Sequence, residues 1–380
     1  MDITITPDLL KGDIQVIPSK SQAHRLLICA AFADKPTQLI CPDTNQDIEA
    51  TANCLRALGA DIIRTEPGYT VYPIKNLAKS ATLPCGESGS TLRFMLPVVG
   101  ALGVDATFLM EGRLPQRPLS PLWEEMERMG CKLSKSDNTL LCQGKLQQGH
   151  YRIDGSVSSQ FISGLKFAHW IMGGCTLEIT GNIESKPYID MTDDAIALFE
   201  NHHSPGYIQV EGDWSNGAFW LVAQALGNEL SITGLHQDSK QGDRAVVNHI
   251  QSIHAGTAII DAKDIPDLVP ILSIAAAANH GATFTNIQRL RIKESDRVAS
   301  TIAMVQALGG KATATENSLT VLPCHFTGGT VDACNDHRIA MSTAIAATVS
   351  TAPVTILGAQ CVNKSYPKFW EEYSRLGGKI

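Results

Sequence analysis

The sequence predicts an α/β (α+β) protein of two similar globular domains, each built from three copies of one repeat of alternating helices and strands. Three observations support this prediction. The chain has 380 residues, enough for about two domains with separate cores. A turn rich in Ser, Gly or Asp precedes an apolar helical pattern six times, and a short β-branched segment follows each pattern. Such internal repetition is typical of repeated supersecondary structure.

The six turns are alike in composition and occupy residues 18–21, 86–90, 155–159, 212–216, 265–267 and 335–338. Ser, Asp and Asn favour the N-cap of a helix, where unpaired backbone N–H groups and partial positive charge attract anions. For any single turn, helix capping alone is a sufficient explanation. The same regions also carry cations, namely Lys20, Arg25, Arg93, Lys166, Arg291, Lys293, Arg297 and Arg338. If the repeats converge, the sequence therefore predicts a cationic cleft.

The six strands are expected at residues 37–42, 106–112, 175–181, 229–235, 282–288 and 353–359. Their first residues are separated by 53 to 71 residues, which is longer than a typical solenoid repeat, so we expect compact packing of repeats within domains. Four outer helices are expected to end on glycine-containing sequences, at residues 58–61, 129–132, 308–311 and 376–379. Glycine at these positions fits a helix C-cap.

The composition excludes several classes of protein. A hydrophobic content of 44% with 18% charged residues is typical of a globular protein. The net charge of -7 and pI near 5.9 argue against a nucleic-acid or acidic-membrane binder. The ten cysteines show no metal-ligand spacing. The N-terminus lacks the shape of a signal peptide, and the longest apolar run, residues 268–278, is too short to span a membrane. We therefore expect a cytoplasmic protein with free thiols.

The segment Arg291–Arg297 is the densest group of charges in the chain. It follows a β-branched run at residues 282–287 and opens a helical pattern, and it contains three cations and two carboxylates. On a helix, Lys293 and Arg297 lie four residues apart and share a face, with Glu294 beside them. The simpler alternative is a solvent-exposed helix start with local ion pairs.

Ten segments, in this order, resemble the enolpyruvyl transferases, and most closely those that act on shikimate 3-phosphate. The segments are SKSQAHR (19–25), GESGSTLR (86–93), QRP (116–118), DGSVSSQF (154–161), SKPYIDMT (185–192), VEGD (210–213), IPD (265–267), RIKESDR (291–297), NDHRIAM (335–341) and KSYP (364–367). Each motif alone is weak evidence, but ten motifs in the right order are strong evidence.

The resemblance implies a two-domain enzyme, each domain having three βαβαββ-type repeats with inward-pointing helix N-termini. Residues 19–211 would form the domain on the shikimate 3-phosphate side, and residues 1–18 with 212–380 the other, with the active site in the cleft between them. The implied reaction transfers the enolpyruvyl group of phosphoenolpyruvate to the 5-hydroxyl of shikimate 3-phosphate and releases phosphate, in aromatic amino acid (chorismate) biosynthesis. The resemblance also implies a monomer that needs no cofactor.

Both implied substrates carry a phosphate and a carboxylate, so binding them requires fixed cations, hydroxyls and backbone donors. By resemblance, the ligands of shikimate 3-phosphate are Lys20, Ser21, Arg25, Ser158, Ser159, Gln160, Ser185, Tyr188, Asp267, Arg289 and Lys293. Helix capping is the alternative role for Ser158 and Ser159. Arg289 stands where the family often has asparagine, and its charge suits the same anion.

The phosphoenolpyruvate ligands implied by the resemblance are Lys20, Gly89, Arg117, Gln160, Arg297, Arg338 and Lys364. Arginine suits carboxylate and phosphate because its planar group binds two oxygens at once. Gly89 lets backbone N–H groups approach the ligand, and any side chain there would intrude on it. In this family the position affects the herbicide glyphosate, so Gly89 predicts an enzyme that glyphosate inhibits.

The implied chemistry is an addition followed by an elimination through a tetrahedral intermediate. We expect Asp267 to take the proton of the 5-hydroxyl, although after Pro266 it also fits a helix N-cap. We expect Glu294 to exchange a proton with C3 of phosphoenolpyruvate, and Lys20 to assist as an acid or charge stabiliser.

Two other functions remain open at this point. The sister enzyme that acts on UDP-N-acetylglucosamine normally has a reactive cysteine just before its Arg-Pro pair, and residues 111–118 contain none. A non-catalytic anion-binding repeat protein would not be expected to combine Lys20, Asp267, Glu294, Arg338 and Lys364. Residues 18, 24 and 87, here Pro, His and Glu, differ from the commonest family residues and bear on affinity and inhibitor response.

Overall fold

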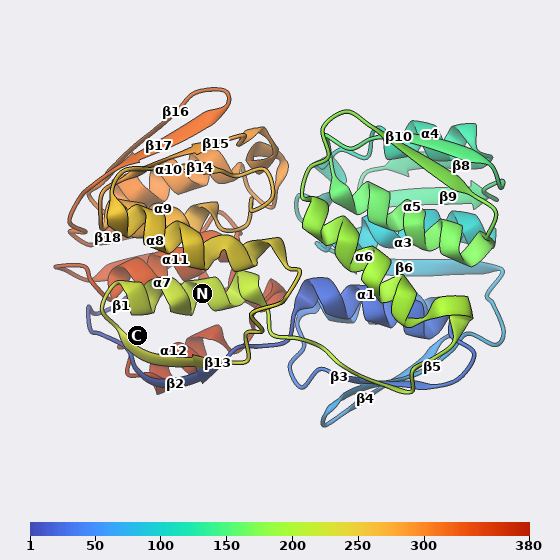
Figure 1. Cartoon of the computed structure of the whole chain (residues 1–380), viewed down its shortest axis with the longest axis horizontal. Coiled ribbons are helices and arrows are strands. Elements are labelled where there is room, and N and C mark those ends of the chain that lie inside the picture. The colour runs from blue at the N-terminus through green and yellow to red at the C-terminus, as the bar shows by residue number, and fades with distance from the viewer. The chain divides into compact units, whose positions relative to one another are not determined.

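The computed structural model describes residues 1–380 and divides them into two compact units (Figure 1). The first unit contains residues 18–211, and the second contains residues 1–17 and 212–380. The chain therefore begins and ends in the second unit. Each unit holds helices and strands in alternation.

In the first unit, one repeat has the full βαβαββ order. It comprises β6 (Ser80–Gly86), α3 (Gly89–Leu102), β7 (Asp105–Met110), η1 (Leu114–Gln116), α4 (Leu122–Arg128), β8 (Cys131–Ser136) and β9 (Thr139–Gly144). The sheet order is β6-β7-β9-β8, with β6 parallel to β7 and the remaining pairs antiparallel. The helix α3 is therefore the crossover between two parallel strands.

The other two repeats of the first unit depart from this order. Their elements are α1 (Lys20–Ala31), β3 (Thr37–Ile40), α2 (Gln46–Leu58), β4 (Asp61–Thr65), β5 (Gly68–Tyr72), β10 (His150–Asp154), α5 (Ser159–Met172), β11 (Thr176–Thr180), α6 (Lys186–Leu198), η2 (Glu200–His202) and β12 (Tyr207–Gln209). The strand β12, from the end of the unit, completes the sheet β12-β3-β5-β4. The repeat of β10 and β11 has only these two parallel strands and lacks the hairpin.

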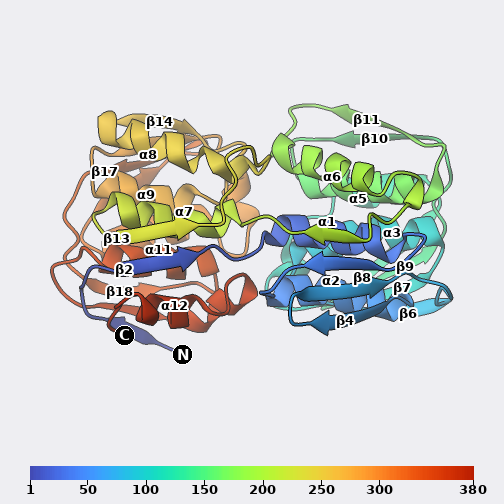
Figure 2. The same ribbon diagram turned by 60° about the horizontal axis from the view of Figure 1, so that its bottom comes forward.

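The second unit repeats this arrangement. Its elements are β1 (Ile3–Ile5), β2 (Lys11–Gln15), α7 (Trp214–Ala225), β13 (Glu229–Thr233), η3 (Gly242–Ala245), α8 (Val246–Ala255), β14 (Ala258–Asp261), α9 (Val269–Ala277), β15 (Ala282–Thr285), η4 (Gln288–Ile292), α10 (Arg297–Ala307), β16 (Lys311–Ala314), β17 (Ser318–Leu322), β18 (Gly329–Asp332), α11 (His337–Ala347), β19 (Val354–Leu357), η5 (Ala359–Lys364) and α12 (Phe369–Arg375). The sheets are β14-β15-β17-β16, β1-β19-β18 and β13-β2. Here too the repeat of β2 and β13 is a single parallel pair, seen side by side in Figure 2. Each unit therefore contains one repeat that is a single parallel pair, and the β1-β19-β18 sheet has three strands.

The six predicted strands are confirmed as β3, β7, β11, β13, β15 and β19, and the six predicted turns precede α1, α3, α5, α7, α9 and α11. Five of these helices have a side-chain N-cap that accepts a backbone N–H, namely Ser19, Ser88, Ser158, Asp213 and Asp336. The exception is α9, whose N-cap is Leu268 without a side-chain cap, so Asp267 is not the cap that its position suggested. Its carboxylate is left for other contacts.

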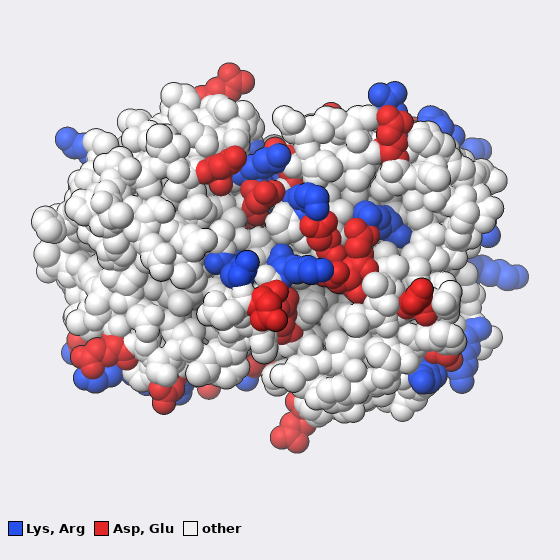
Figure 3. Space-filling view, viewed as in Figure 1, with Lys and Arg blue, Asp and Glu red and all other residues white.

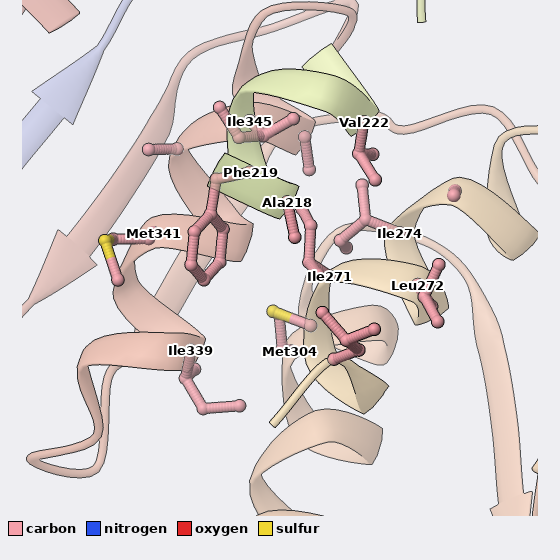
Figure 4. Packing of buried hydrophobic residues seen from close by; sticks show 14 of the residues in the cluster. Ala218, Phe219, Val222, Ile271, Leu272, Ile274, Met304, Ile339, Met341 and Ile345 are labelled. Carbon is pink, nitrogen blue, oxygen red and sulfur yellow. The ribbon is translucent and has the colours of Figure 1, made fainter. Parts of the chain in front are cut away.

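The inner helices form the core of each unit. Every residue of α9 and α11 is buried, and Figure 4 shows Phe219, Ile271, Met304 and Ile339, which belong to the same core cluster. Burial of such side chains contributes about 1.5–3 kcal/mol each. Because these helices are covered along their length, the polar residues at their N-terminal ends are held by the core. None of the helices is long and apolar enough to cross a membrane.

Candidate active site

The predicted site residues fall into two groups, one in each unit. The first unit contains Lys20, Ser21, Arg25, Gly89, Arg117, Ser158, Ser159, Gln160, Ser185 and Tyr188. The second unit contains Asp267, Arg289, Lys293, Glu294, Arg297, Arg338 and Lys364. In both units most of these residues lie at or next to the N-terminal ends of helices, or on the turns that precede them.

Arg297, the first residue of α10, is the centre of the second group. Its guanidinium donates to Asp267 Oδ1 at 2.7 Å, to Glu294 Oε2 at 2.7 Å and to Asp336 Oδ2 at 2.9 Å. Its side chain is 1% exposed, whereas those of Asp267 and Glu294 are 33% and 23% exposed. Burial opposes the charge, but Asp336, Glu294 and Asp267 together raise the pKa of Arg297 above its ordinary value. One buried cation thus fixes two carboxylates that remain open to a ligand.

Asp336 is a functional neighbour that the sequence reasoning did not single out. It is fully buried, caps α11 through the Arg338 N–H at 2.9 Å and accepts from Ser295 Oγ at 3.0 Å. Its bond to Arg297 joins the starts of α10 and α11. Asp336 was visible only as part of a capping turn, because nothing in the sequence pairs it with an arginine 39 residues away.

Lys293 does not lie on the helix, contrary to the prediction from its spacing. Its backbone is extended (φ -83°, ψ -158°) and α10 begins at Arg297, because Asp296 caps that helix through the Ala299 N–H. Lys293 Nζ nevertheless lies 3.4 Å from Asp267 Oδ1. Burial lowers the pKa of Lys293 to about 8, and the positive charge of Arg289 also acts to lower it. The negative charge of Asp267 acts in the opposite direction and raises it. Lys293 is therefore an ammonium group that titrates near neutral pH beside a carboxylate.

Two more predicted cations lie at the start of α11. Arg338 NH1 donates to the Ser215 carbonyl oxygen at 2.9 Å, and Arg338 NH2 lies 3.6 Å from Asp267 Oδ2. Lys364, the last residue of η5, donates from Nζ to the Asn335 carbonyl oxygen at 2.8 Å. Both side chains are almost completely buried. Two buried cationic side chains therefore lie at the turn before α11.

In the first unit, the N-terminal end of α3 forms a second cationic cluster, made of Gly89, Ser90, Arg93, Arg117 and Gln160. Gln160 accepts from Arg93 NH1 at 2.8 Å and donates to Ser90 Oγ at 2.8 Å. A Cβ added to Gly89 would lie 2.6 Å from Arg117 NH1 and 3.0 Å from Arg93 NH1. Glycine at 89 thus allows two guanidinium groups to lie against the first turn of a helix, which is an arrangement suited to an anion.

Lys20 opens α1 and donates from Nζ to Asp47 Oδ2 at 2.7 Å. Arg25, one turn later, is buried, and most of its guanidinium is used within the protein. It donates to the carbonyl oxygens of Ser21 and Tyr188 at 2.6 Å each, and to Thr192 Oγ1 at 2.9 Å. Burial lowers the pKa of Arg25 to about 10. These contacts tie α1 to α6, and the ligand role of Arg25 stays a prediction.

The predicted hydroxyl ligands lie at the starts of α5 and α6. Ser158 caps α5 through the Gln160 N–H at 3.3 Å, so the capping role that the sequence left open is confirmed. Ser159 is the first residue of α5 and is buried. Ser185 has a left-handed backbone (φ 52°) immediately before α6, an unusual conformation for a non-glycine residue that often marks a functional position.

The charged side chains of the protein form small local groups of mixed sign. On the face drawn in Figure 3, basic and acidic side chains are intermixed, without a broad area of one sign. There is no group of three or more His, Cys, Asp and Glu side chains that could hold a metal ion. The helix starts described above combine backbone N–H groups with cationic side chains, an arrangement suited to anions.

Known proteins resemble this chain along its whole length. A family model described as EPSP synthase (3-phosphoshikimate 1-carboxyvinyltransferase) matches residues 5–373. The 3-phosphoshikimate 1-carboxyvinyltransferase of Clostridium kluyveri is 36% identical over 416 residues, covering 100% of this chain and 98% of that protein. That of Clostridium novyi is 35% identical over 426 residues, covering 100% and 98%.

Solved structures resemble it in fold. The EPSP synthase from Acinetobacter baumannii has a TM-score of 0.78 at 22% identity, covering 99% of this chain and 98% of that one. The enolpyruvyl transferase NikO from Streptomyces tendae has a TM-score of 0.76 at 17% identity, covering 99% and 97%. The predicted enolpyruvyl transferase fold is thereby confirmed.

Proposed function

This chain belongs to the EPSP synthase family, and we propose that it transfers the enolpyruvyl group of phosphoenolpyruvate to the 5-hydroxyl of shikimate 3-phosphate with release of phosphate. This step belongs to aromatic amino acid biosynthesis. The observation that carries the proposal is the pair of partly exposed carboxylates, Asp267 and Glu294, held on the buried guanidinium of Arg297. Addition and elimination at one carbon need two such proton-transfer groups in fixed positions.

Asp267 acts as the base for the 5-hydroxyl. Arg297 and Lys293 both contact Oδ1, and Arg338 lies 3.6 Å from Oδ2, so three cations stabilise its ionised form. Glu294 exchanges a proton with C3 of phosphoenolpyruvate. Because Arg297 contacts both carboxylates, it fixes their spacing while the substrate reacts between them.

The cationic helix starts bind the two anions. Phosphoenolpyruvate is taken by Lys20, Gly89, Arg117, Gln160, Arg297, Arg338 and Lys364. Shikimate 3-phosphate is taken by Lys20, Ser21, Arg25, Ser158, Ser159, Gln160, Ser185, Tyr188, Asp267, Arg289 and Lys293. The proposed ligands of each substrate come from both units. The Gly89 turn, with two arginines against it, supports the assignment of phosphoenolpyruvate.

We further propose that glyphosate inhibits this enzyme, since Gly89 leaves the turn of α3 without a side chain. The enzyme is proposed to work as a monomer in the cytoplasm. All ten cysteines are free thiols and Cys334 is exposed, which suits a reducing compartment.

One assay tests the reaction. Phosphate release from phosphoenolpyruvate is measured with shikimate 3-phosphate, with UDP-N-acetylglucosamine, and with neither. We expect release only with shikimate 3-phosphate. Release only with UDP-N-acetylglucosamine would assign the chain to the sister activity, and no release under any condition would leave an anion-binding protein without this chemistry.

A further inference from the structure

A buried histidine lies between two predicted ligands on α1. His24 is fully buried, and its ring meets that of Phe94 edge to face at 6.2 Å between centroids. Its Nδ1 lies 2.7 Å from Thr51 Oγ1, whereas its Nε2 is buried without a hydrogen-bond partner. The ring thus has a single polar contact, and that contact points to α2.

From Thr51, hydrogen bonds continue to the start of α3. Thr51 Oγ1 lies 2.7 Å from Thr91 Oγ1, and Thr91 donates to Ser88 Oγ at 2.8 Å, with the Asp47 carbonyl oxygen a second acceptor at 3.4 Å. Ser88 is the N-cap of α3 and immediately precedes Gly89. The chain His24–Thr51–Thr91–Ser88 therefore joins α1 to the turn that carries Gly89.

Counting protons fixes the direction of this chain. A hydroxyl has one proton to donate, and Thr91 directs its proton to Ser88 or to Asp47. Thr91 must then accept from Thr51, which uses the single proton of Thr51. His24 must in turn donate to Thr51, so Nδ1 carries the ring proton. Nε2 then carries no proton and is an acceptor that is buried without a hydrogen-bond partner.

The surroundings keep this arrangement unchanged near neutral pH. Burial, followed by the charges of Lys20 and Arg25, lowers the pKa of His24 well below its ordinary value. A second proton would place a cation on Nε2, where no acceptor is available. His24 is therefore a fixed donor in this environment.

Two predicted phosphoenolpyruvate positions, Lys20 and Gly89, lie next to residues of this chain. Asp47, whose carbonyl oxygen lies beside Thr91, holds Lys20 Nζ at 2.7 Å through its carboxylate. Ser88 sets the start of α3, and with it the turn of Gly89 against Arg117. A change in the threonine chain would move one anion-binding helix start relative to the other within the first unit.

We propose that His24 is a positioning residue for phosphoenolpyruvate, which it aligns through the hydrogen-bond chain of Thr51, Thr91 and Ser88. This inference rests on the proposed function, because it names the substrate that the helix starts receive. His24 touches no reacting atom in this scheme. Its effect is on the alignment of Lys20 and the Gly89 turn.

The test uses two matched pairs of variants in the full chain. Thr51→Val removes the hydroxyl at constant size, and Thr51→Ser keeps it; His24→Leu removes the donor at the δ position, and His24→Asn keeps it. We expect Thr51→Val and His24→Leu to raise the KM for phosphoenolpyruvate about five- to tenfold, the loss typical of one buried hydrogen bond. We expect kcat, and the KM for shikimate 3-phosphate, to change less than about twofold. Thr51→Ser and His24→Asn should stay near the wild-type values.

The proposal would be overturned if the two variants of a pair changed the KM for phosphoenolpyruvate equally. It would also be overturned if kcat fell and the KM values for both substrates rose together. A readout independent of activity separates this result from failure of the proposed function. In ¹⁵N NMR spectra between about pH 5.5 and 8.5, spanning the ordinary histidine pKa, the His24 ring should show a protonated Nδ1 and no titration. A proton on Nε2, or titration in this range, would refute the hydrogen-bond chain even in an enzyme that is active.

Discussion

Substitution of Gly89 by alanine probes the anion-binding turn of α3 with one methyl group. The added Cβ would lie 2.6 Å from Arg117 NH1, and 3.0 Å from Arg117 Cζ and Arg93 NH1. Ordinary contacts begin near 3.4 Å, so the Arg117 guanidinium must move by roughly 1 Å. The backbone of Gly89 is helical, so alanine adds no strain to the main chain.

The expected effect is on one substrate. A displaced arginine loses charge-assisted hydrogen bonds to its ligand, which are worth about 1.5–3 kcal/mol, so the KM for phosphoenolpyruvate should rise roughly 10- to 100-fold. Affinity for shikimate 3-phosphate and the kcat should change little, and inhibition by glyphosate should weaken. Steady-state kinetics with each substrate varied in turn measure all these quantities.

A matched control separates this effect from general loss of stability. Gly256→Ala adds a methyl group that meets no atom within 4 Å, so it should leave all kinetic constants unchanged. An unchanged KM for phosphoenolpyruvate in Gly89→Ala, with the melting temperature preserved, would refute the assignment of this turn. Equal rises in both KM values would indicate a general distortion of the first unit instead.

Three further predictions concern the second unit. Asp267→Ala and Glu294→Gln should each lower kcat by about 10²–10⁴ with substrate affinity largely intact, and near-normal turnover of either purified variant would contradict its catalytic role. Asp336→Ala removes the fully buried carboxylate that pairs with Arg297 and leaves it only the partly exposed Asp267 and Glu294, which should cost about 3–5 kcal/mol in urea unfolding; a loss below 1 kcal/mol would contradict a structural ion pair here. The pKa of Lys293 is lowered from 10.5 to about 8 in the folded protein. Between these two pH values the unfolded chain therefore binds a proton on Lys293 that the folded protein does not. The free energy of unfolding should therefore rise with pH across this window, by up to about 3 kcal/mol relative to Lys293→Met, and parallel stability curves for the two proteins would exclude the shift.

The inner helices could be predicted from the sequence because their signals are local. A capping side chain and the N–H that it binds are two or three residues apart, as with Ser88 and Thr91, and the strands that follow carry their own β-branched pattern. The sequence also identified the cationic character of these helix starts. Such features need no knowledge of tertiary contacts.

Other features depended on contacts between distant residues. Lys293 has helical spacing to Arg297, but Asp296 caps α10 and excludes Lys293 from the helix, since a cap next to the first turn outweighs a favourable spacing. Asp336 pairs with Arg297 although 39 residues separate them in the chain, and no pattern in the sequence indicates that pair. The missing hairpin of the β10 and β11 repeat is likewise decided by strand pairing in space.

The division of the chain has a consequence for its synthesis. The strands β1 and β2 leave the ribosome before their partners β19 (Val354–Leu357) and β13 (Glu229–Thr233), which are translated much later. Residues 18–211 form a complete unit that can fold in the meantime. The first seventeen residues must wait unpaired until the C-terminal half emerges, so the nascent protein exposes a strand edge for most of its translation.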